Sequence, residues 1–228
     1  MRDPEGQGNG SSGEGDSSEI DATPPGTMGP ELSLQEAIGT RAFWLLFFLY
    51  GLCIVVLGMI MIHIVPHLTD RGMSATAAAN VLGAIGLGSI LGRILVGVLS
   101  DRYGTRLVMV ACLIVKCIVL LCLPRTGGFL ASYALGFFYG VSYGGFMILV
   151  PALTSYLFGL AAMGAIFATI SIAEGIGFGL GSYLAGYIWD VTGTYQMMFL
   201  IGIALILVSM LLAAVLKAPA VEKPDPVS

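Results

Sequence analysis

Two ionisable side chains interrupt apolar stretches of this 228-residue chain, and they carry opposite charges. Arg93 stands in the run GRILVGVL, and Glu174 stands in the run ISIAEGIGFGLG. The planar fork of an arginine can bind a carboxylate through two parallel hydrogen bonds, and a carboxyl group within a membrane can carry a proton. A charge inside a membrane helix is costly, so it usually faces a cavity or a partner. These two residues are therefore the candidate binding site for an anionic ligand.

The elements that must position them are membrane helices by composition and length. Hydrophobic residues make up 57% of the chain and charged residues only 11%, a balance that soluble domains do not show. From Arg41 onward we expect six apolar spans of about 17 to 27 residues, long enough to cross a hydrocarbon core of about 30 Å. They cover about residues 43–65, 75–99, 107–123, 129–150, 162–188 and 197–216, and three of them end before Pro66, Pro124 and Pro151. The sequence thus predicts an all-α membrane protein.

Charge placement predicts the domain organisation and the orientation. Residues 1–40 are rich in Gly, Ser, Pro and acids, so we expect a disordered acidic cytosolic leader or linker. A six-helix transmembrane domain over 41–217 and a short cytosolic tail over 218–228 follow it. Lys and Arg gather on the side of the two termini, which predicts that both termini are cytosolic. We expect a multi-pass protein of the plasma (inner) membrane. The basic residues on that side are Arg2, Arg41, Arg102, Arg106, Lys217 and Lys223, against Arg71 and Arg125 on the other.

Glycine is concentrated in the second and fifth spans, which are the middle members of two triplets of helices. This arrangement predicts two inverted three-helix repeats, because transporters built this way often place interrupted helices at matching positions. Two interpretations stay open for each glycine. Small residues let membrane helices approach closely, and they also permit bending beside a transport site.

The depth of the two charges leaves three alternatives for the arginine. If its helix ends near Ser100, Arg93 lies roughly 10 Å from the cytosolic end, and Glu174 lies roughly 18 Å from it. Arg93 could bind the substrate anion, pair with Glu174 as a structural bridge, or extend its side chain toward the headgroups. Lys116, in the third span, is expected to reach toward the headgroups or to meet a polar neighbour, and it is left out of the site.

The stretch GVLSDRYGTR between the second and third spans resembles the signature loop of the major facilitator superfamily, G-x-x-x-D-R/K-x-G-x-R/K. Its matching residues are Gly97, Asp101, Arg102, Gly104 and Arg106. The preceding Gly92-Arg93 is similar to the monocarboxylate porter and oxalate/formate antiporter branch, as are the stretches from His63 to Gly72 and from Gly186 to Tyr195. Together they cover nearly everything from Ser33 to Leu216. The resemblance implies half of a major facilitator fold, the carboxy-terminal six helices of a twelve-helix transporter.

The resemblance also implies roles for these residues. Arg93 would hold a substrate carboxylate, and Glu174 would tune the site or carry a proton. The signature loop would set a cytosolic gate, although plain electrostatic anchoring is an alternative for Arg102 and Arg106. The oxalate exchangers carry a lysine in the helix that matches the fifth span, and this chain does not. A dianionic substrate is therefore disfavoured, because Glu174 offsets the charge of Arg93.

His63, near the end of the first span, is a possible proton relay. The alternative is a hydrogen bond that caps or ties a helix end. The four cysteines show no paired spacing, and no nucleophile, base and orienting partner recur together. We therefore predict no enzyme, no cofactor and no metal site. Nucleic-acid binding is not expected, because the polar leader is acidic.

The predicted function is transmembrane transport of a small organic anion, monocarboxylate-like, by alternating access. Coupling would be to a proton (symport) or to a counter-anion (antiport). The expected partners are the substrate, membrane lipid and another transporter half, either a separate chain or a second copy in a homodimer. The alternative is a non-transporting membrane subunit or truncated half that needs a separate amino-terminal half.

Overall fold

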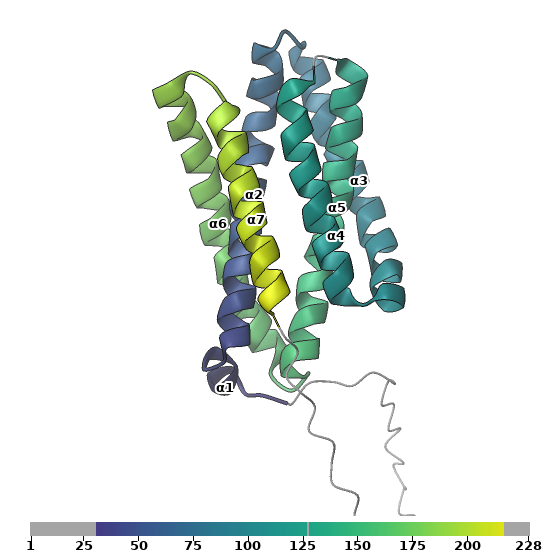
Figure 1. Ribbon diagram of the computed structural model, residues 1–228, viewed down its shortest axis with the longest axis vertical. Coiled ribbons are helices and arrows are strands. Elements are labelled where there is room, and N and C mark those ends of the chain that lie inside the picture. The colour runs from purple at the N-terminus through teal and green to yellow at the C-terminus, as the bar shows by residue number, and fades with distance from the viewer. Residues whose placement is uncertain (1–30, 127, 217–228) are drawn as a thin grey trace, which may run out of the picture.

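The computed structural model describes residues 31–126 and 128–216, and these form a bundle of long helices (Figure 1). The described part contains helices and connecting turns and no strand. In chain order the helices are α1 (Leu34–Ile38), α2 (Arg41–Asp70), α3 (Ala75–Tyr103), α4 (Thr105–Cys122), the short 3-10 helix η1 (Leu123–Arg125), α5 (Phe129–Phe158), α6 (Met163–Thr192) and α7 (Gln196–Val215).

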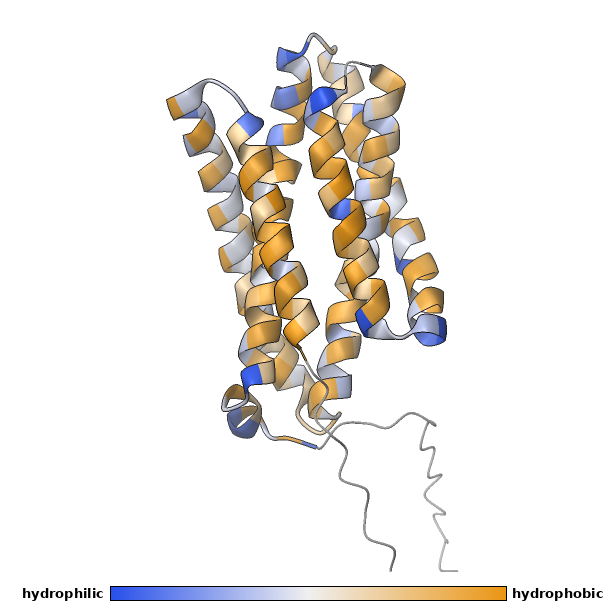
Figure 2. Ribbon diagram, in the orientation of Figure 1, coloured by the Kyte–Doolittle hydropathy of each residue, from blue (hydrophilic) through white to orange (hydrophobic). Residues whose placement is uncertain are grey.

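Six of the helices are long and apolar enough to cross a membrane, which confirms the six predicted spans. They are α2, α3, α4 continued into η1, α5, α6 and α7. Many hydrophilic residues lie near the helix ends, and the long central stretches are mainly apolar or intermediate, with isolated hydrophilic residues among them (Figure 2). An apolar flank over the whole length of a bundle is what lipid contact requires.

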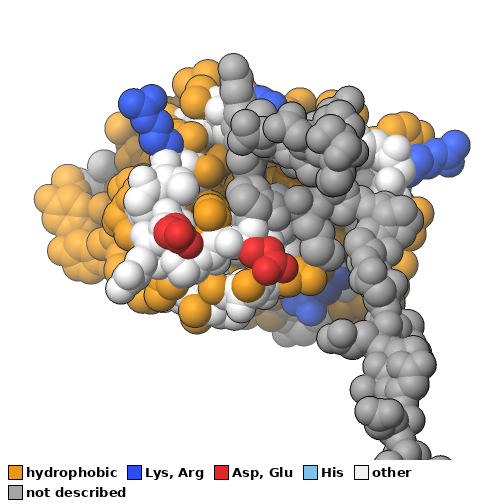
Figure 3. Space-filling view, turned by 90° about the horizontal axis from the view of Figure 1, so that it is seen from below, with side chains coloured by type: hydrophobic (Ala, Val, Ile, Leu, Met, Phe, Trp, Pro, Cys, Tyr) orange, Lys and Arg blue, Asp and Glu red, His pale blue; other side chains and the backbone are white. Residues whose placement is uncertain are grey.

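The two ends of the bundle carry different connections. Both ends of the described chain and the α3–α4 and α5–α6 connections lie at one end, the lower end in Figure 1. The opposite end carries the α2–α3, α4–α5 and α6–α7 connections. Figure 3 looks onto the lower end and shows Lys and Arg side chains at several points of its rim, with apolar side chains along the flanks.

The predicted ends of the first and fourth spans are wrong, because both helices continue through a proline. Helix α2 passes Pro66 and ends at Asp70, and α5 passes Pro151 and ends at Phe158. A proline removes one backbone donor and disturbs the preceding turn. Neighbouring helices in a packed membrane bundle allow such residues inside a span. The helices are therefore one to two turns longer than the apolar pattern indicated.

A second correction concerns the stretch 1–40, which the sequence assigned to a disordered leader. Its residues 34–38 form helix α1. The helix begins with a capping box: the amide of Glu36 donates to the hydroxyl of Ser33, and the carboxylate of Glu36 accepts from the Ser33 amide at 2.8 Å. Ala37 is fully buried and anchors the helix to the bundle. Residues 1–30 and the predicted tail 218–228 lie outside the described residues.

The packing of the six spans is reciprocal between the triplets α2–α4 and α5–α7. The first helix of each triplet packs on the second helix of the other, which gives the two closely packed pairs α2–α6 and α3–α5. The first helix of each triplet also packs on the third helix of the other. Because α2 and α5 run in opposite directions along the bundle, the two triplets are inverted repeats (Figure 1). This arrangement is the one expected of half a major facilitator fold.

Glycines let both pairs pack backbone against backbone. In α3–α5, a Cβ atom added at Gly92 would lie 2.1 Å from the carbonyl oxygen of Val141. In α2–α6, a Cβ atom at Gly181 would lie 1.9 Å from the carbonyl oxygen of Val55. These glycines serve the close-packing alternative. Others in the same helices, such as Gly86 and Gly179, have nothing within 4 Å of an added Cβ and leave the second alternative open.

Candidate functional site

Arg93 and Glu174 lie at nearly the same depth in the bundle. Helix α3 continues past Ser100 to Tyr103, so Arg93 is about ten residues, or roughly 15 Å, from its lower end. Glu174 is about eleven residues, or roughly 16 Å, from the start of α6 at that end. The mismatch in depth expected from the sequence was therefore wrong, because the second span was taken to be too short. The two helices form opposite flanks of the bundle (Figure 1).

Glu174 is held by a tyrosine that the sequence analysis did not single out. The hydroxyl of Tyr50 in α2 donates a hydrogen bond to Glu174 Oε2 at 2.7 Å. The Tyr50 side chain is only 2% exposed, whereas Glu174 is exposed on the surface of the described chain. A hydrogen bond to a carboxylate is stronger than one between neutral groups. The tyrosine therefore orients one carboxylate oxygen from within the bundle and leaves the other face of the carboxyl group accessible.

Arg93 is exposed on α3, and among the described residues it has no hydrogen-bond or ion-pair partner. The direct Arg93–Glu174 bridge is thus not formed in the described part of the chain. Tyr143 in α5, a half-buried side chain, lies within electrostatic range of both charges. An arginine on one flank, a carboxylate on the other and a tyrosine within reach of both form a polar band across an apolar surface. Substrate binding and extension toward the headgroups both stay predictions for Arg93.

The surfaces that carry the two charges are otherwise apolar. On α3 the exposed side chains beside Arg93 include Leu91 and Ile94, which are 51% and 65% exposed. On α6 they include Ile172 and Ile176, each 56% exposed. Contiguous apolar surface of this kind requires lipid or another protein surface. The charges therefore lie where a second surface could enclose them.

The signature-loop residues gather at the lower end of α3 and α4. Gly104 joins the two helices with a φ of 88°, a conformation that favours glycine because it has no Cβ. Asp101 and Arg102 are exposed in the last turn of α3, and the Arg102 guanidinium lies 5.7 Å from the centre of the Tyr103 ring. Gly97 is one step deeper, where an added Cβ would meet the side chain of Ile148 at 3.4 Å. Asp101 takes part in none of the hydrogen bonds of the described residues, so its role in a gate stays a prediction.

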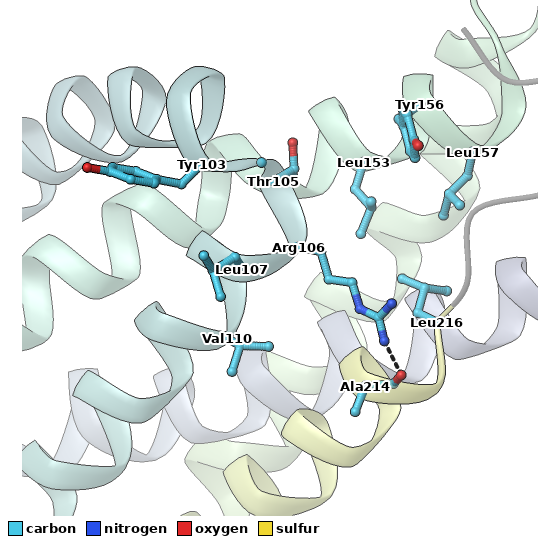
Figure 4. A pocket seen from close by; sticks show the side chains of 11 residues that line it. Tyr103, Thr105, Arg106, Leu107, Val110, Leu153, Tyr156, Leu157, Ala214 and Leu216 are labelled. Carbon is cyan, nitrogen blue, oxygen red and sulfur yellow. Dashed lines mark hydrogen bonds between the residues drawn. The ribbon is translucent and has the colours of Figure 1, made fainter. Parts of the chain in front are cut away.

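Arg106 is the loop residue with the clearest contacts. Its Nε donates to the carbonyl oxygen of Ala213 at 3.2 Å, and its Nη2 donates to the carbonyl oxygen of Ala214 (Figure 4). These carbonyls end α7, where a cation is favoured by the helix dipole. The side chain forms one wall of a mainly apolar cavity of about 700 Å³ between α4, α5 and the end of α7. Arg106 therefore ties the first triplet to the last helix at the lower end.

His63 lies deeper than expected, because α2 extends to Asp70. It is about two turns inside the helix, and its Nε2 is 3.1 Å from the carbonyl oxygen of Ser182 in α6. Its ring also packs on Tyr195, with 5.6 Å between ring centres. With the carbonyl as acceptor, Nε2 carries the proton and donates. This geometry fits the alternative in which the histidine ties two helices, and the proton-relay role stays a prediction.

Lys116 does not reach toward the headgroups, so that expectation was wrong. The side chain is 2% exposed, and its Nζ lies 4.2 Å from the centre of the Phe146 ring in α5. The thiols of Cys53 and Cys112 lie within electrostatic range of the amine. The run of hydrophobic residues around Lys116 gave no sign that this helix face points into the bundle. All four cysteines are free, and the described residues hold no cluster of three or more metal-ligating side chains.

Comparisons with known proteins agree with this architecture. The profile of the Major Facilitator Superfamily matches residues 43–228. The chain is 26% identical over 156 residues to monocarboxylate transporter 12 of Rattus norvegicus, covering 66% of this chain and 32% of that protein. It is 31% identical over 152 residues to monocarboxylate transporter 13 of Bos taurus, covering 64% and 35%. A third relative is the MFS-type transporter pynF of Aspergillus niger, 33% identical over 120 residues, which cover 51% of this chain and 27% of that protein.

The matches thus span about a third of the length of these curated relatives. They agree with the helical fold, the six spans and the reciprocal packing of two inverted triplets. A family of transporters also agrees with the prediction that the chain is not an enzyme. The chain belongs to the major facilitator superfamily.

Proposed function

We propose that this chain takes part in the transport of a small monocarboxylate-like anion by alternating access. The observation that carries the proposal is the pair of opposite charges at one depth of the bundle. Arg93 has no partner among the described residues, and Glu174 is held by Tyr50 rather than by the arginine. Two relatives named monocarboxylate transporters support the choice of substrate class.

In this proposal Arg93 binds the substrate carboxylate and Glu174 responds to it. A guanidinium matches a carboxylate with two parallel hydrogen bonds, which gives orientation as well as affinity. Glu174 is exposed on the other flank and would take up or release the coupling proton, or repel a second anionic group. Exchange with a counter-anion would use the same arginine. One cation opposed by one acid favours a monoanion over a dianion.

We infer that the signature-loop residues control access at the lower end. Arg106 joins α4 to the last carbonyls of α7, so this contact must be kept or exchanged whenever the triplets move relative to each other. Asp101 and Arg102 are exposed beside it and available to a second half. In the proposed orientation this end is cytosolic, in the plasma (inner) membrane, because Arg41, Arg102 and Arg106 all lie there.

A complete cavity in this proposal needs a second set of helices. Arg93 and Glu174 both stand on exposed apolar surface, and the chain spans about a third of the length of its relatives. A separate amino-terminal half or a second copy of this chain would enclose them, with membrane lipid covering the remaining flanks. The second candidate function is a membrane subunit that does not transport by itself, and the same exposed surface is what favours it.

The test is anion uptake by the purified chain in liposomes, alone and together with the amino-terminal half of a monocarboxylate transporter. We expect uptake of labelled lactate or pyruvate under an inward proton or anion gradient. Arg93→Ala should lower uptake about tenfold or more, because a charge-assisted bidentate contact is lost. Arg125→Ala is the matched control, since this exposed arginine stands at the upper end of the bundle, away from the proposed site.

The outcomes separate the alternatives. Uptake that survives Arg93→Ala at the wild-type rate would reject the substrate role of this arginine. Uptake that occurs only with the added half supports a split transporter, and the mass of the purified chain then tells whether it is a monomer. No uptake in either preparation favours the non-transporting subunit.

A further inference from the structure

The lower end of the bundle holds a cavity whose apolar space the proposed function does not use. It measures about 700 Å³ and lies between the start of α4, the last turns of α5 and the end of α7. Figure 4 shows the Arg106 side chain reaching from α4 toward the carbonyl oxygen of Ala214. Among the described lining residues, Arg106 is the only one that carries a charge. A mainly apolar space with a single cation in its wall suits a ligand that is partly apolar and partly anionic.

A second cavity, of about 430 Å³, continues the first one along α4 and α7. Val110 and Ala214 line both cavities, so the two spaces adjoin. The side chains around the second cavity are apolar, and they are Val110, Leu207, Met210, Leu211 and Ala214. Leu207 stands about eight residues, or roughly 12 Å, before the lower end of α7. Since the hydrocarbon core of a bilayer is about 30 Å thick, the two cavities lie within the depth of one leaflet.

The α4–α7 face that carries these cavities is open to the surroundings of the bundle. Figure 1 shows α4 and α7 on the near side, with no described helix in front of them. Leu107 of the first cavity and Leu211 of the second are 63% and 67% exposed. The two charges of the candidate site stand on other helices, α3 and α6. In a membrane, an uncovered apolar face of this kind meets lipid chains.

The polar residues of the first cavity are of the kinds that membrane proteins place at the headgroup level. Tyr103 and Tyr156 line it and are 58% and 45% exposed. Tyrosine is enriched where a membrane meets water, because its ring is apolar and its hydroxyl is polar. Arginine at this level attracts anionic headgroups. The cavities are therefore polar toward the headgroups and apolar toward the membrane core, which is the polarity of a phospholipid.

Arg106 has hydrogen-bond donors left for a ligand. Its Nε and Nη2 donate to the carbonyl oxygens of Ala213 and Ala214, and within the described part of the chain its Nη1 donates to no residue. A guanidinium has five N–H donors, so three remain. The Thr105 hydroxyl accepts from the hydroxyl of Ser100 at 3.0 Å and keeps its own proton for another acceptor. No acid is among the described lining residues, so no carboxylate in the cavity wall competes with an anion.

We propose that the two adjoining cavities bind one anionic phospholipid of the surrounding membrane. Its phosphate accepts hydrogen bonds from Arg106 and Thr105, and one of its acyl chains lies between α4 and α7 in the second cavity. Because the headgroup uses donors that Arg106 does not spend on α7, the contact between α4 and α7 stays in place. The proposed orientation puts this site in the cytosolic leaflet, where anionic lipids create a negative surface. Binding itself needs only a headgroup layer at this end of the bundle, whether or not the chain transports an anion.

The experiment is a lipid titration of the purified full chain in detergent, followed by native mass spectrometry. The two probes are phosphatidylglycerol, which is anionic, and phosphatidylcholine with the same acyl chains, which has no net charge. We expect one phosphatidylglycerol to bind about fivefold more tightly than phosphatidylcholine, the factor typical of one basic residue facing an anionic headgroup. Arg106→Gln should bind the two lipids about equally. Arg41→Gln is the matched control, because it removes another exposed arginine at the lower end that lines neither cavity.

A second variant tests the acyl-chain part of the site without touching the arginine. Ala214→Phe puts a ring where the two cavities adjoin and keeps the backbone carbonyl that Arg106 contacts. It should weaken the binding of both lipids severalfold. Ala111→Phe is its control, since Ala111 is exposed on α4 and lines neither cavity. Thermal unfolding shows which variants keep the fold, and Ala214→Phe decides the result if Arg106→Gln does not fold.

Several outcomes would overturn the proposal. Equal affinities of the unmodified chain for the two lipids would do so, as would an unchanged preference in folded Arg106→Gln or unchanged binding in folded Ala214→Phe. Loss of the preference in Arg41→Gln as well would show a general effect of surface charge. Displacement of the lipid by inorganic phosphate would show a simple anion site. Lipid binding that appears only after removal of residues 218–228 would assign the cavity to the chain's own tail. The readout needs no transport, so failure of the transport proposal leaves this one standing.

Discussion

The two closely packed helix pairs share one construction and treat their charges differently. In both pairs, glycines bring one backbone directly against the other. In α2–α6 the charge of Glu174 is tied to the partner helix through Tyr50. In α3–α5 the charge of Arg93 is exposed and has no hydrogen bond or ion pair among the described residues. Inverted repeats can thus keep the same packing while they differ in how free their polar side chains are.

The difference indicates a division of tasks. A carboxylate held by a buried tyrosine keeps its position while its protonation changes. An arginine without a protein partner keeps all its donors available for a ligand. Under the proposed function, one pair would supply a fixed carboxylate and the other a free binding group. Substitutions that disrupt the shared glycine packing should lower the stability of both pairs. Substitutions of the polar groups should affect the stability of the two pairs differently.

The largest expected effect comes from breaking the shared packing. Gly92→Ala and Gly181→Ala each place a methyl group within about 2 Å of a facing carbonyl oxygen, so the helices must separate. We expect each to lower the free energy of unfolding by about 3 kcal/mol or more. Thermal unfolding in detergent, followed by circular dichroism, measures this.

The matched controls are Gly86→Ala and Gly179→Ala, which lie on the same two helices and meet nothing within 4 Å. They should unfold at the wild-type temperature or slightly above it, because alanine favours helix over glycine by roughly 0.5–1 kcal/mol. Equal unfolding temperatures for the tight and open positions would show that the glycine contacts do not hold the two pairs together.

A smaller effect should distinguish the pairs. Tyr50→Phe removes the hydrogen bond to Glu174 and should lower stability by about 1.5 kcal/mol, since the acceptor is charged. Arg93→Gln should change stability by less than about 0.5 kcal/mol, because the side chain is exposed and unpartnered among the described residues. Denaturant unfolding of both variants gives the values. Similar losses for both would remove the proposed difference between a tied and a free charge.

The smallest effect concerns α1, which packs on α2 and α6 at the lower end and has no counterpart on α3–α5 within residues 31–126 and 128–216. Hydrogen bonds from Ser33 lower the pKa of Glu36 below its ordinary value of 4.5. A carboxyl whose pKa is lowered on folding stabilises the folded state above that ordinary value, and this contribution is lost as the pH falls through the lowered pKa. Amide hydrogen exchange in α1 should therefore become less protected at acidic pH.

In this last test, Ser33→Ala is the control, because it removes the Ser33 hydroxyl, which accepts from the Glu36 amide and donates to its carboxylate, and keeps only the bond from the Ser33 backbone amide. Its α1 exchange, corrected for the intrinsic pH dependence of the chemistry, should vary less across the same range. An equally steep loss of protection in Ser33→Ala would mean that another group controls the acid response of α1.

Much of the fold could be read from the residues. Apolar stretches of membrane length gave all six spans, and the placement of glycine in the second and fifth gave the inverted triplets. Pro66 and Pro151 were misleading, because a packed bundle carries a helix through a proline that would end it in water. That error also displaced His63, which lies within its helix rather than at its end.

The candidate site was predictable only as two separate residues. Arg93 and Glu174 could be found because a charge inside an apolar run is unusual. Tyr50 could not, since its hydroxyl meets an acceptor 124 residues away in the chain. Lys116 was assigned to the wrong environment for a related reason: its neighbours in sequence are apolar whether its helix face meets lipid or protein.

The sequence by itself determined which segments cross the membrane and where their charges stand along the chain, because both depend on local composition. The tertiary structure decided which face of each helix is buried, which glycines pack, and that Arg93 and Glu174 share one depth. The physical reason is that lipid and protein interior are both apolar, so hydrophobicity does not tell one face of a membrane helix from the other. Only contacts between distant segments make that choice.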